Sequence, residues 1–132
     1  GLYKELNDRY DFDFDPCPLQ CKENNLKVAW GKRNFLNPPF NKIAKFVDKA
    51  FEEHQKGNLV VMLLPARVNS LYWHKKIFAH ATSVEFCRGA MKFEGFNKGA
   101  PFPVAIVVFD GKPKEKRPYN ETGGYKWFPI TL

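Results

Sequence analysis

An uninterrupted apolar run at residues 59–64, Leu-Val-Val-Met-Leu-Leu, constrains the fold more than any other feature of this sequence. A strand with one face in water alternates apolar and polar side chains, so a run without alternation predicts a strand that is buried on both faces. Residues 104–109, Val-Ala-Ile-Val-Val-Phe, form a second run of the same kind. We therefore expect an α/β structure in which helices cover both faces of a sheet.

The segments around these two strands predict the remaining elements. After Asn41, which is expected to cap a helix, apolar residues recur at helical spacing as far as Phe51, and Gly57 is placed to end that helix. Further elements are expected at residues 2–9 (helix), 10–14 (strand), 33–36 (strand), 70–78 (helix capped by Ser70), 83–86 (strand) and 91–93 (strand). Strands that alternate with helices in this way are typical of a mostly parallel sheet.

Length and composition favour one catalytic or binding domain, expected over residues 1–110, followed by a basic loop or tail at 111–132. The net charge of +7 favours a polyanionic partner, although a merely soluble basic protein would have the same charge. No apolar run approaches the roughly 20 residues of a membrane span, and the first residues are too polar for a signal peptide. We expect a cytoplasmic protein, or one inside a host cell if it is of phage or viral origin.

The three cysteines are too few and too odd in number for a disulfide scaffold, so reduced thiols are expected. Cys17 and Cys21 could form half of a zinc site, but no second half with suitable spacing follows, and we expect no metal.

The tetrapeptide Asn37-Pro38-Pro39-Phe40 lies between a predicted strand and a predicted helix. The amino group of adenine is a poor nucleophile because its lone pair is delocalised into the ring. Two acceptors aimed at its two N–H bonds, the Asn37 side-chain oxygen and the next backbone carbonyl, would favour a more tetrahedral nitrogen that can attack a methyl sulfonium. The two prolines would fix those acceptors in advance, and Phe40 would stack on the base. The alternative is an ordinary strand-ending turn in which Asn37 caps and Phe40 enters the core.

The tetrapeptide resembles the (D/N/S)-PP-(Y/F) motif of amino-group methyltransferases, and Asn at its first position is similar to the adenine-N6 enzymes. Much of the chain, about residues 2–110, resembles the phage-type DNA N6-adenine methyltransferase (Dam) family. The stretches that carry this resemblance are Leu2–Asn7, Phe12–Cys17, Trp30, Phe35–Phe40, Leu63–Arg67, Trp73-His74, Phe86–Gly89, Phe93 and Phe109.

The resemblance implies a compact Rossmann-like methyltransferase fold, S-adenosylmethionine as cofactor and DNA adenine as substrate. It places Asp15, Pro16 and Cys17 in a loop that faces the methionine part of the cofactor, and Asn37 would also contact the cofactor. The expected catalytic residues are Asn37, Pro38, Pro39 and Phe40. The cofactor region is expected to be shortened, because residues 16–36 leave little room and contain only one acid, Glu23. The family's Trp-x-Thr-Pro cofactor element would lie just before Gly1.

Nucleic-acid contacts are expected from basic and amide side chains near the presumed active edge: Lys42, Arg67, Asn69, Arg88 and Lys92. A structural surface role for Arg67 and Asn69 is equally compatible with the sequence. The target base would flip out of double-stranded DNA, and pairing of two copies is one way for a domain this small to enlarge its DNA contact. Alternatives are methyl transfer to RNA adenine or to protein glutamine, or a degenerate methyltransferase fold that only binds nucleic acid.

Overall fold

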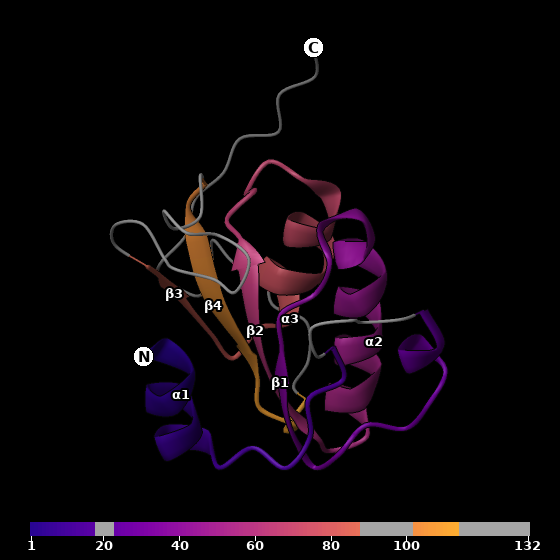
Figure 1. Cartoon of the computed structure of the whole chain (residues 1–132). Helices are drawn as coiled ribbons and strands as arrows, with labels where there is room; N and C mark the ends of the chain where they lie inside the picture. The colour runs from indigo at the N-terminus through magenta and orange to yellow at the C-terminus, as the bar shows by residue number, and fades with distance from the viewer. Residues whose placement is uncertain (18–22, 88–101, 114–132) are drawn as a thin grey trace.

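The computed structural model describes residues 1–17, 23–87 and 102–113. In this part of the chain a four-stranded sheet of order β1-β2-β4-β3 has helices on both faces (Figure 1). The strands are β1 (Arg33–Leu36), β2 (Leu59–Pro65), β3 (Ser83–Phe86) and β4 (Val104–Phe109), and the main helices are α1 (Leu2–Tyr10), α2 (Ile43–Gln55) and α3 (Phe78–His80). Shorter helical turns are η1 (Glu23–Leu26), η2 (Phe40–Lys42) and the π-helical η3 (Trp73–Ile77).

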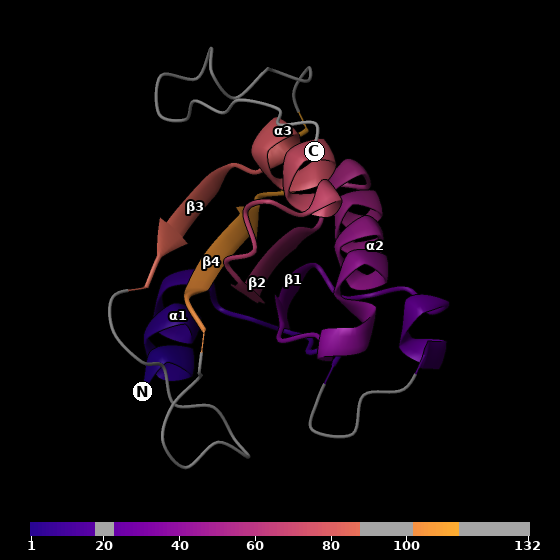
Figure 2. The same ribbon diagram turned by 90° about the horizontal axis from the view of Figure 1, so that it is seen from above.

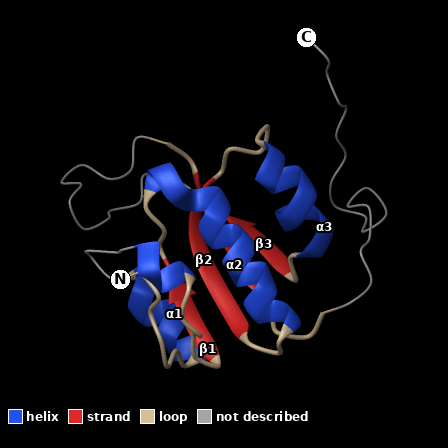
Figure 3. Cartoon of the chain, turned by 90° about the vertical axis from the view of Figure 1, so that its right-hand side faces the viewer, coloured by secondary structure: helices blue, strands red, loops and turns tan. Residues whose placement is uncertain are grey.

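The two apolar runs form the central strands, and every residue of β2 and β4 is buried, as predicted. Successive side chains of a strand point to opposite faces. Val60, Met62 and Leu64 therefore join the core beneath α2, whereas Leu59, Val61 and Leu63 join the core around Leu6 of α1. Figure 2 shows α1 on one side of the sheet with α2 and α3 on the other, and Figure 3 shows α2 lying across the sheet.

The sheet is not mostly parallel, and that prediction is wrong. β1 pairs in parallel with β2, but β4 is antiparallel to both β2 and β3. Three strands still point the same way, and β4 runs against them in the middle of the sheet. A run of apolar residues predicts burial on both faces, but it contains no information about strand direction, and this is why the prediction failed.

The predicted strand at residues 10–14 is reduced to a single parallel bridge between Phe14 and Asn34. Helix α1 continues through Tyr10, and Asp11 then takes the left-handed conformation with φ 53°. Instead of forming a strand, this segment packs the Phe12 ring against the rings of Tyr3 and Phe35, on the face of the sheet that α1 covers.

Two predicted helix caps are absent from their expected places. A 3₁₀ turn at Phe40–Lys42 precedes α2, whose N-cap is Lys42 rather than Asn41, with no capping side-chain hydrogen bond. The hydroxyl of Ser70 donates to the carbonyl of Arg67, 2.6 Å away, instead of capping the helical segment after it. Gly57, with φ 98°, does follow the end of α2 as predicted. The expected strand at 91–93 and most of the tail at 111–132 lie outside the described residues.

A buried carboxylate near the C-terminal end of α2 was not predicted from the sequence. The Glu53 side chain is 1% exposed and accepts hydrogen bonds from Asn58 Nδ2 at 3.1 Å and from the Trp30 backbone N–H at 3.4 Å. It also pairs with Lys49 at 3.3 Å and with Lys56 at 3.4 Å. Burial acts to raise the pKa of Glu53, but the hydrogen bonds and charges around it, Lys49 first, outweigh burial and lower that pKa. This network fixes α2 against the segment that enters β1.

We predict that Glu53→Gln lowers the free energy of unfolding by about 2 kcal/mol at pH 7, because buried donors lose an ionised acceptor. A depressed folded pKa gives stability that is present above the ordinary value of 4.5 and is lost as pH falls through the folded pKa. In urea titrations, the difference in the free energy of unfolding between wild type and variant should therefore become smaller from pH 7 to pH 3. Glu52→Gln, at the exposed neighbouring position, is the matched control. A penalty for Glu53→Gln that is equal at both pH values would contradict this role.

Candidate active site

Three loops leave the sheet at one edge because the segments before them run in the same direction. Phe14 pairs in parallel with Asn34 of β1, and β1 pairs in parallel with β2. The loops that follow, at residues 15–17, 37–40 and 66–69, therefore start from the same edge. Figure 1 shows the loops after β1 and β2 at the upper end of the sheet. The bridge and the β1–β2 pairing thus place the starts of these three loops at the same edge of the sheet.

The tetrapeptide Asn37–Phe40 lies at the surface of this edge. Asn37 is exposed and Pro38 is buried, so the backbone is packed while the amide side chain remains accessible. Pro39 is extended at φ −65° and ψ 144°, and its carbonyl accepts the Lys42 N–H at 3.0 Å. Phe40 is 48% exposed, so the alternative in which its ring enters the core is wrong. The two ends of the motif are thus available to a ligand, and the prolines between them are held by the protein.

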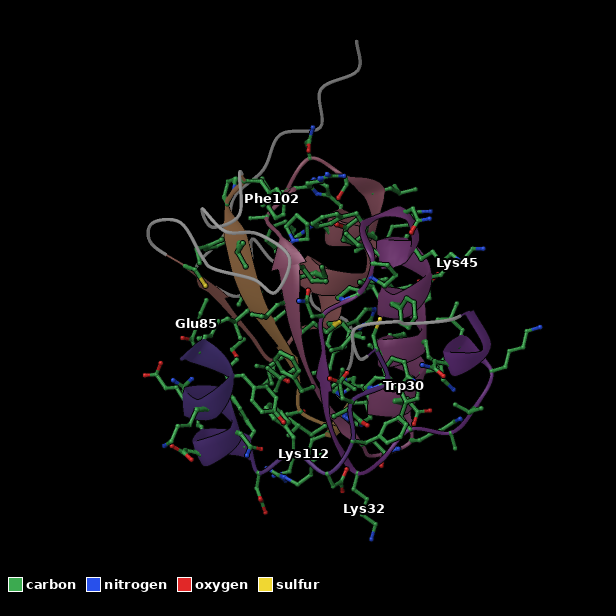
Figure 4. The ribbon with its side chains drawn as sticks, in the orientation of Figure 1. Trp30, Lys32, Lys45, Glu85, Phe102 and Lys112 are labelled. Atoms are coloured by element: carbon green, nitrogen blue, oxygen red, sulfur yellow. The ribbon has the colours of Figure 1, made fainter. Side chains whose placement is uncertain are left out.

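A second aromatic ring, which the sequence analysis missed, lies against Phe40. The Phe102 ring is 5.1 Å from the Phe40 ring, centroid to centroid, and almost perpendicular to it at 88°. Phe102 lies just before β4, and because β4 runs against β2, its first residues return to the active edge (Figure 4). The only sequence signal was an aromatic residue between two prolines before a buried strand, and it gave no strand direction.

The loop after Phe14 is held largely by its own hydrogen bonds. The Cys17 N–H donates to Asp15 Oδ1 at 2.9 Å, and the Pro16 carbonyl accepts Asn25 Nδ2 at 2.7 Å. Asp15 remains exposed at the surface, yet partial desolvation raises the pKa of its carboxyl group, while the Cys17 N–H acts in the opposite direction. Cys17 is disulfide-bonded, so the expectation of reduced thiols is wrong there, whereas Cys87 is free.

The loop after β2 is a tight turn, and the buried Trp73 holds the end of β2 from which it starts. The Ser70 N–H donates to the Arg67 carbonyl at 2.9 Å, and Arg67 and Asn69 are both exposed. Trp73 is fully buried, and its Nε1 donates to the Pro65 carbonyl at 3.2 Å, where β2 ends. Lys42 is half-buried beside the first motif, whereas Arg88 and Lys92 lie outside the described residues. The structure thus brings Lys42, Arg67 and Asn69 to the predicted edge.

The segments that build this edge contain basic residues and almost no acids. Residues 24–47 and 54–84 contain neither Asp nor Glu. They carry Lys27, Lys32, Arg33, Lys42, Lys45, Lys56, Arg67, Lys75 and Lys76. Lys42 and Arg67 follow β1 and β2 at the active edge, whereas Lys32, Arg33 and Lys56 lie at the opposite end of the sheet. The basic residues at the active edge favour a polyanionic partner. Asp15 stands out as a negative group at the same edge.

Residues 3–117 match the family described as DNA N-6-adenine-methyltransferase (Dam). This chain belongs to the Dam family. A DNA N-6-adenine-methyltransferase of Escherichia phage T1 is 40% identical over 63 residues, which make up 46% of this chain and 26% of that protein. The match therefore spans about a quarter of the length of that relative. No solved structure matches the chain.

The Dam-family match includes all three loops of the active edge. Within the described residues no three His, Cys, Asp or Glu side chains are grouped so that they could hold a metal ion. In the same part of the chain, no helix is both long and apolar enough to cross a membrane.

We predict that Trp73→Phe lowers the free energy of unfolding by about 2–3 kcal/mol, because it leaves a void and removes the donor to the Pro65 carbonyl. Amide hydrogen exchange should quicken at residues 66–70. Trp30→Phe is the matched control, since the Trp30 Nε1 donates to the Asn25 carbonyl and should affect residues 25–30 instead. Equal exchange at residues 66–70 in both variants would show that Trp73 does not hold this turn.

Proposed function

We propose that this Dam-family protein transfers the methyl group of S-adenosylmethionine to N6 of adenine in DNA. The observation that supports this most is the form of the tetrapeptide: an exposed Asn37 and an exposed Phe40 flank a backbone that Pro38 anchors in the fold. Family membership supports the same reaction. The acid-poor segments around the site favour a polyanionic substrate.

In the proposed reaction, the Asn37 side-chain oxygen and the Pro38 carbonyl accept hydrogen bonds from the two N–H bonds of the adenine amino group. These acceptors favour the tetrahedral, more nucleophilic nitrogen and stabilise the positive charge that develops on it. Because proline has no N–H, Pro38 and Pro39 offer no competing backbone donor. Phe40 stacks on the base, and Phe102 holds the Phe40 ring by its edge contact. As the N–C bond forms, the S–C bond breaks and S-adenosylhomocysteine would leave; the methylated, cationic amine then loses its extra proton to water, so a general base among the side chains is not needed.

The cofactor would supply an electrophilic methyl group on a sulfonium. Asp15 fits the ammonium group of its methionine part, since the carboxylate is exposed at the same edge as Asn37. Backbone groups of this loop fit less well, because the Cys17 N–H and the Pro16 carbonyl already have partners within the protein. We therefore assign recognition in this loop to the Asp15 side chain, with Pro16 and Cys17 shaping the loop.

DNA would be held by its phosphates, with Arg67 and Lys42 as contacts and Asn69 beside them. A base inside a duplex cannot reach the Asn37 side chain, so the adenine must flip out of the stack. Two copies acting on one duplex would enlarge the contact area beyond that of a single chain.

We predict that Asn37→Ala reduces methyl transfer by about 10²-fold or more while leaving the melting temperature unchanged, because an exposed side chain that holds the amino group is lost. The measurement is incorporation of labelled methyl groups into DNA that lacks N6-methyladenine. Asn41→Ala, at an exposed position in the next turn, is the matched control and should retain full activity. Wild-type transfer to RNA or to protein, but not to DNA, would overturn the substrate assignment.

We predict that Asp15→Asn weakens S-adenosylhomocysteine binding by about tenfold, because an ionised partner of the ammonium group is lost. Since the pKa of Asp15 is raised, wild-type affinity should decline on acidification before an ordinary carboxyl of pKa 3.8 would protonate. Titration calorimetry at several pH values measures both effects. The control is Asp11→Asn, because Asn tolerates the left-handed conformation of that exposed residue. No heat of binding with the folded wild type would favour a protein that has lost its catalytic function.

A further inference from the structure

We propose that Val68 and Leu71 form an apolar wedge that enters the DNA stack and fills the space left by the flipped adenine. This inference rests on the proposed function and adds to it a separate contact with the duplex. Val68 lies in the turn after β2 and Leu71 begins the helical segment that follows this turn, so neither belongs to the tetrapeptide that would hold the base.

The first support is exposure at the active edge. Val68 is 44% exposed and Leu71 is 67% exposed, the largest value among the exposed large hydrophobic residues of the described chain. Both follow β2 where the Asn37–Phe40 loop follows β1, and these strands are direct neighbours, about 4.8 Å apart. Water-exposed apolar side chains beside a candidate active site indicate a surface that becomes covered when the partner binds.

The second support is the rigidity of the turn. The Arg67 carbonyl accepts both the N–H and the hydroxyl of Ser70, and the Arg67 N–H donates to the Pro65 carbonyl at 2.8 Å. The Ala66 N–H donates to the Pro103 carbonyl at 2.8 Å, which ties the base of the turn to the start of β4. Val68 therefore projects from a backbone that is bonded on both sides, and a β-branched side chain adds little rotational freedom. A wedge that is held in place before binding loses little entropy when it enters the stack.

The third support is charge, and it selects the partner. Residues 54–84, which include the turn, contain no acids, and exposed Arg67 directly precedes Val68. An apolar tip flanked by cations suits DNA, whose phosphates pair with the basic groups while the unstacked bases accept the apolar side chain. A second copy of this chain or an apolar peptide offers no comparable match to the basic surroundings.

The test compares single variants on two DNA duplexes that carry the methylated sequence mapped with wild-type protein. In one duplex the target adenine faces thymine, and in the other it faces an abasic site, which removes the partner base and lowers the cost of flipping. The variants are Val68→Ser and Leu71→Ser. The matched control is Val28→Ser, since Val28 is 45% exposed, lies after η1 and belongs to none of the three loops of the active edge.

We expect each wedge variant to methylate the paired duplex about tenfold more slowly than wild type and to recover most of that loss on the abasic duplex. Val28→Ser should match wild type on both, and all variants should keep the wild-type melting temperature. Wedge variants that match Val28→Ser on the paired duplex would overturn the inference while leaving the proposed function intact. A loss of equal size on both duplexes would also overturn it, because the defect would then not lie in flipping. A wild-type protein that methylates no DNA, so that no target sequence can be mapped, would refute the proposed function and the wedge together.

Discussion

The parallel pairing of β1 with β2 determines where the candidate site lies. Arg33 pairs with Leu59 and Leu36 with Met62, so both strands end at the same edge of the sheet. The tetrapeptide after β1 and the turn after β2 are neighbours for this reason alone. If either strand were reversed, Asn37 and Arg67 would lie at opposite ends of the molecule. Burial of β2 on both faces stabilises the arrangement, because each face of this strand contributes to a separate apolar core.

Buried polar groups at the other end of the sheet hold these two strands in register. Asn34 is fully buried, and its Nδ2 donates to the Gly31 carbonyl at 2.9 Å and to the Leu59 carbonyl at 3.0 Å. A Cβ at Gly31 would lie 2.7 Å from the Cβ of Phe14 as well as 2.2 Å from an Asp13 carboxylate oxygen, and the Phe14 contact cannot be relieved by rotating a side chain, so glycine is favoured there. Together with the Glu53 network, these contacts satisfy the backbone where the chain enters β1 and β2. The end of the sheet opposite the active edge is thus held by several buried or partly buried hydrogen bonds.

At the active edge, the backbone is fixed while the side chains with proposed roles remain accessible. Pro38 is buried, the Pro16 carbonyl has an internal partner, and the turn at residues 67–70 is bonded to itself, yet Asn37, Asp15 and Arg67 are exposed. A backbone fixed in this way would reduce the conformational entropy that is lost when the proposed ligands bind. The perpendicular contact between Phe40 and Phe102 has a similar consequence, since it orients the ring that is proposed to stack on the base.

The sequence predicted most of the elements and suggested the chemistry that is proposed for the site, since both depend on local pattern. The unbroken apolar runs predicted β2 and β4 as buried strands, and the helical spacing of apolar residues predicted α2. The tetrapeptide Asn37–Phe40 suggested two hydrogen-bond acceptors for the N–H bonds of an amino group. Tertiary structure alone decided the direction of β4, the place of Phe102 beside Phe40, the burial of Glu53 and the loss of a strand at residues 10–14. Each of these depends on contacts between residues far apart in the chain. A buried strand presents the same apolar pattern in either direction, because its side chains alternate between faces in the same way whichever way the backbone runs.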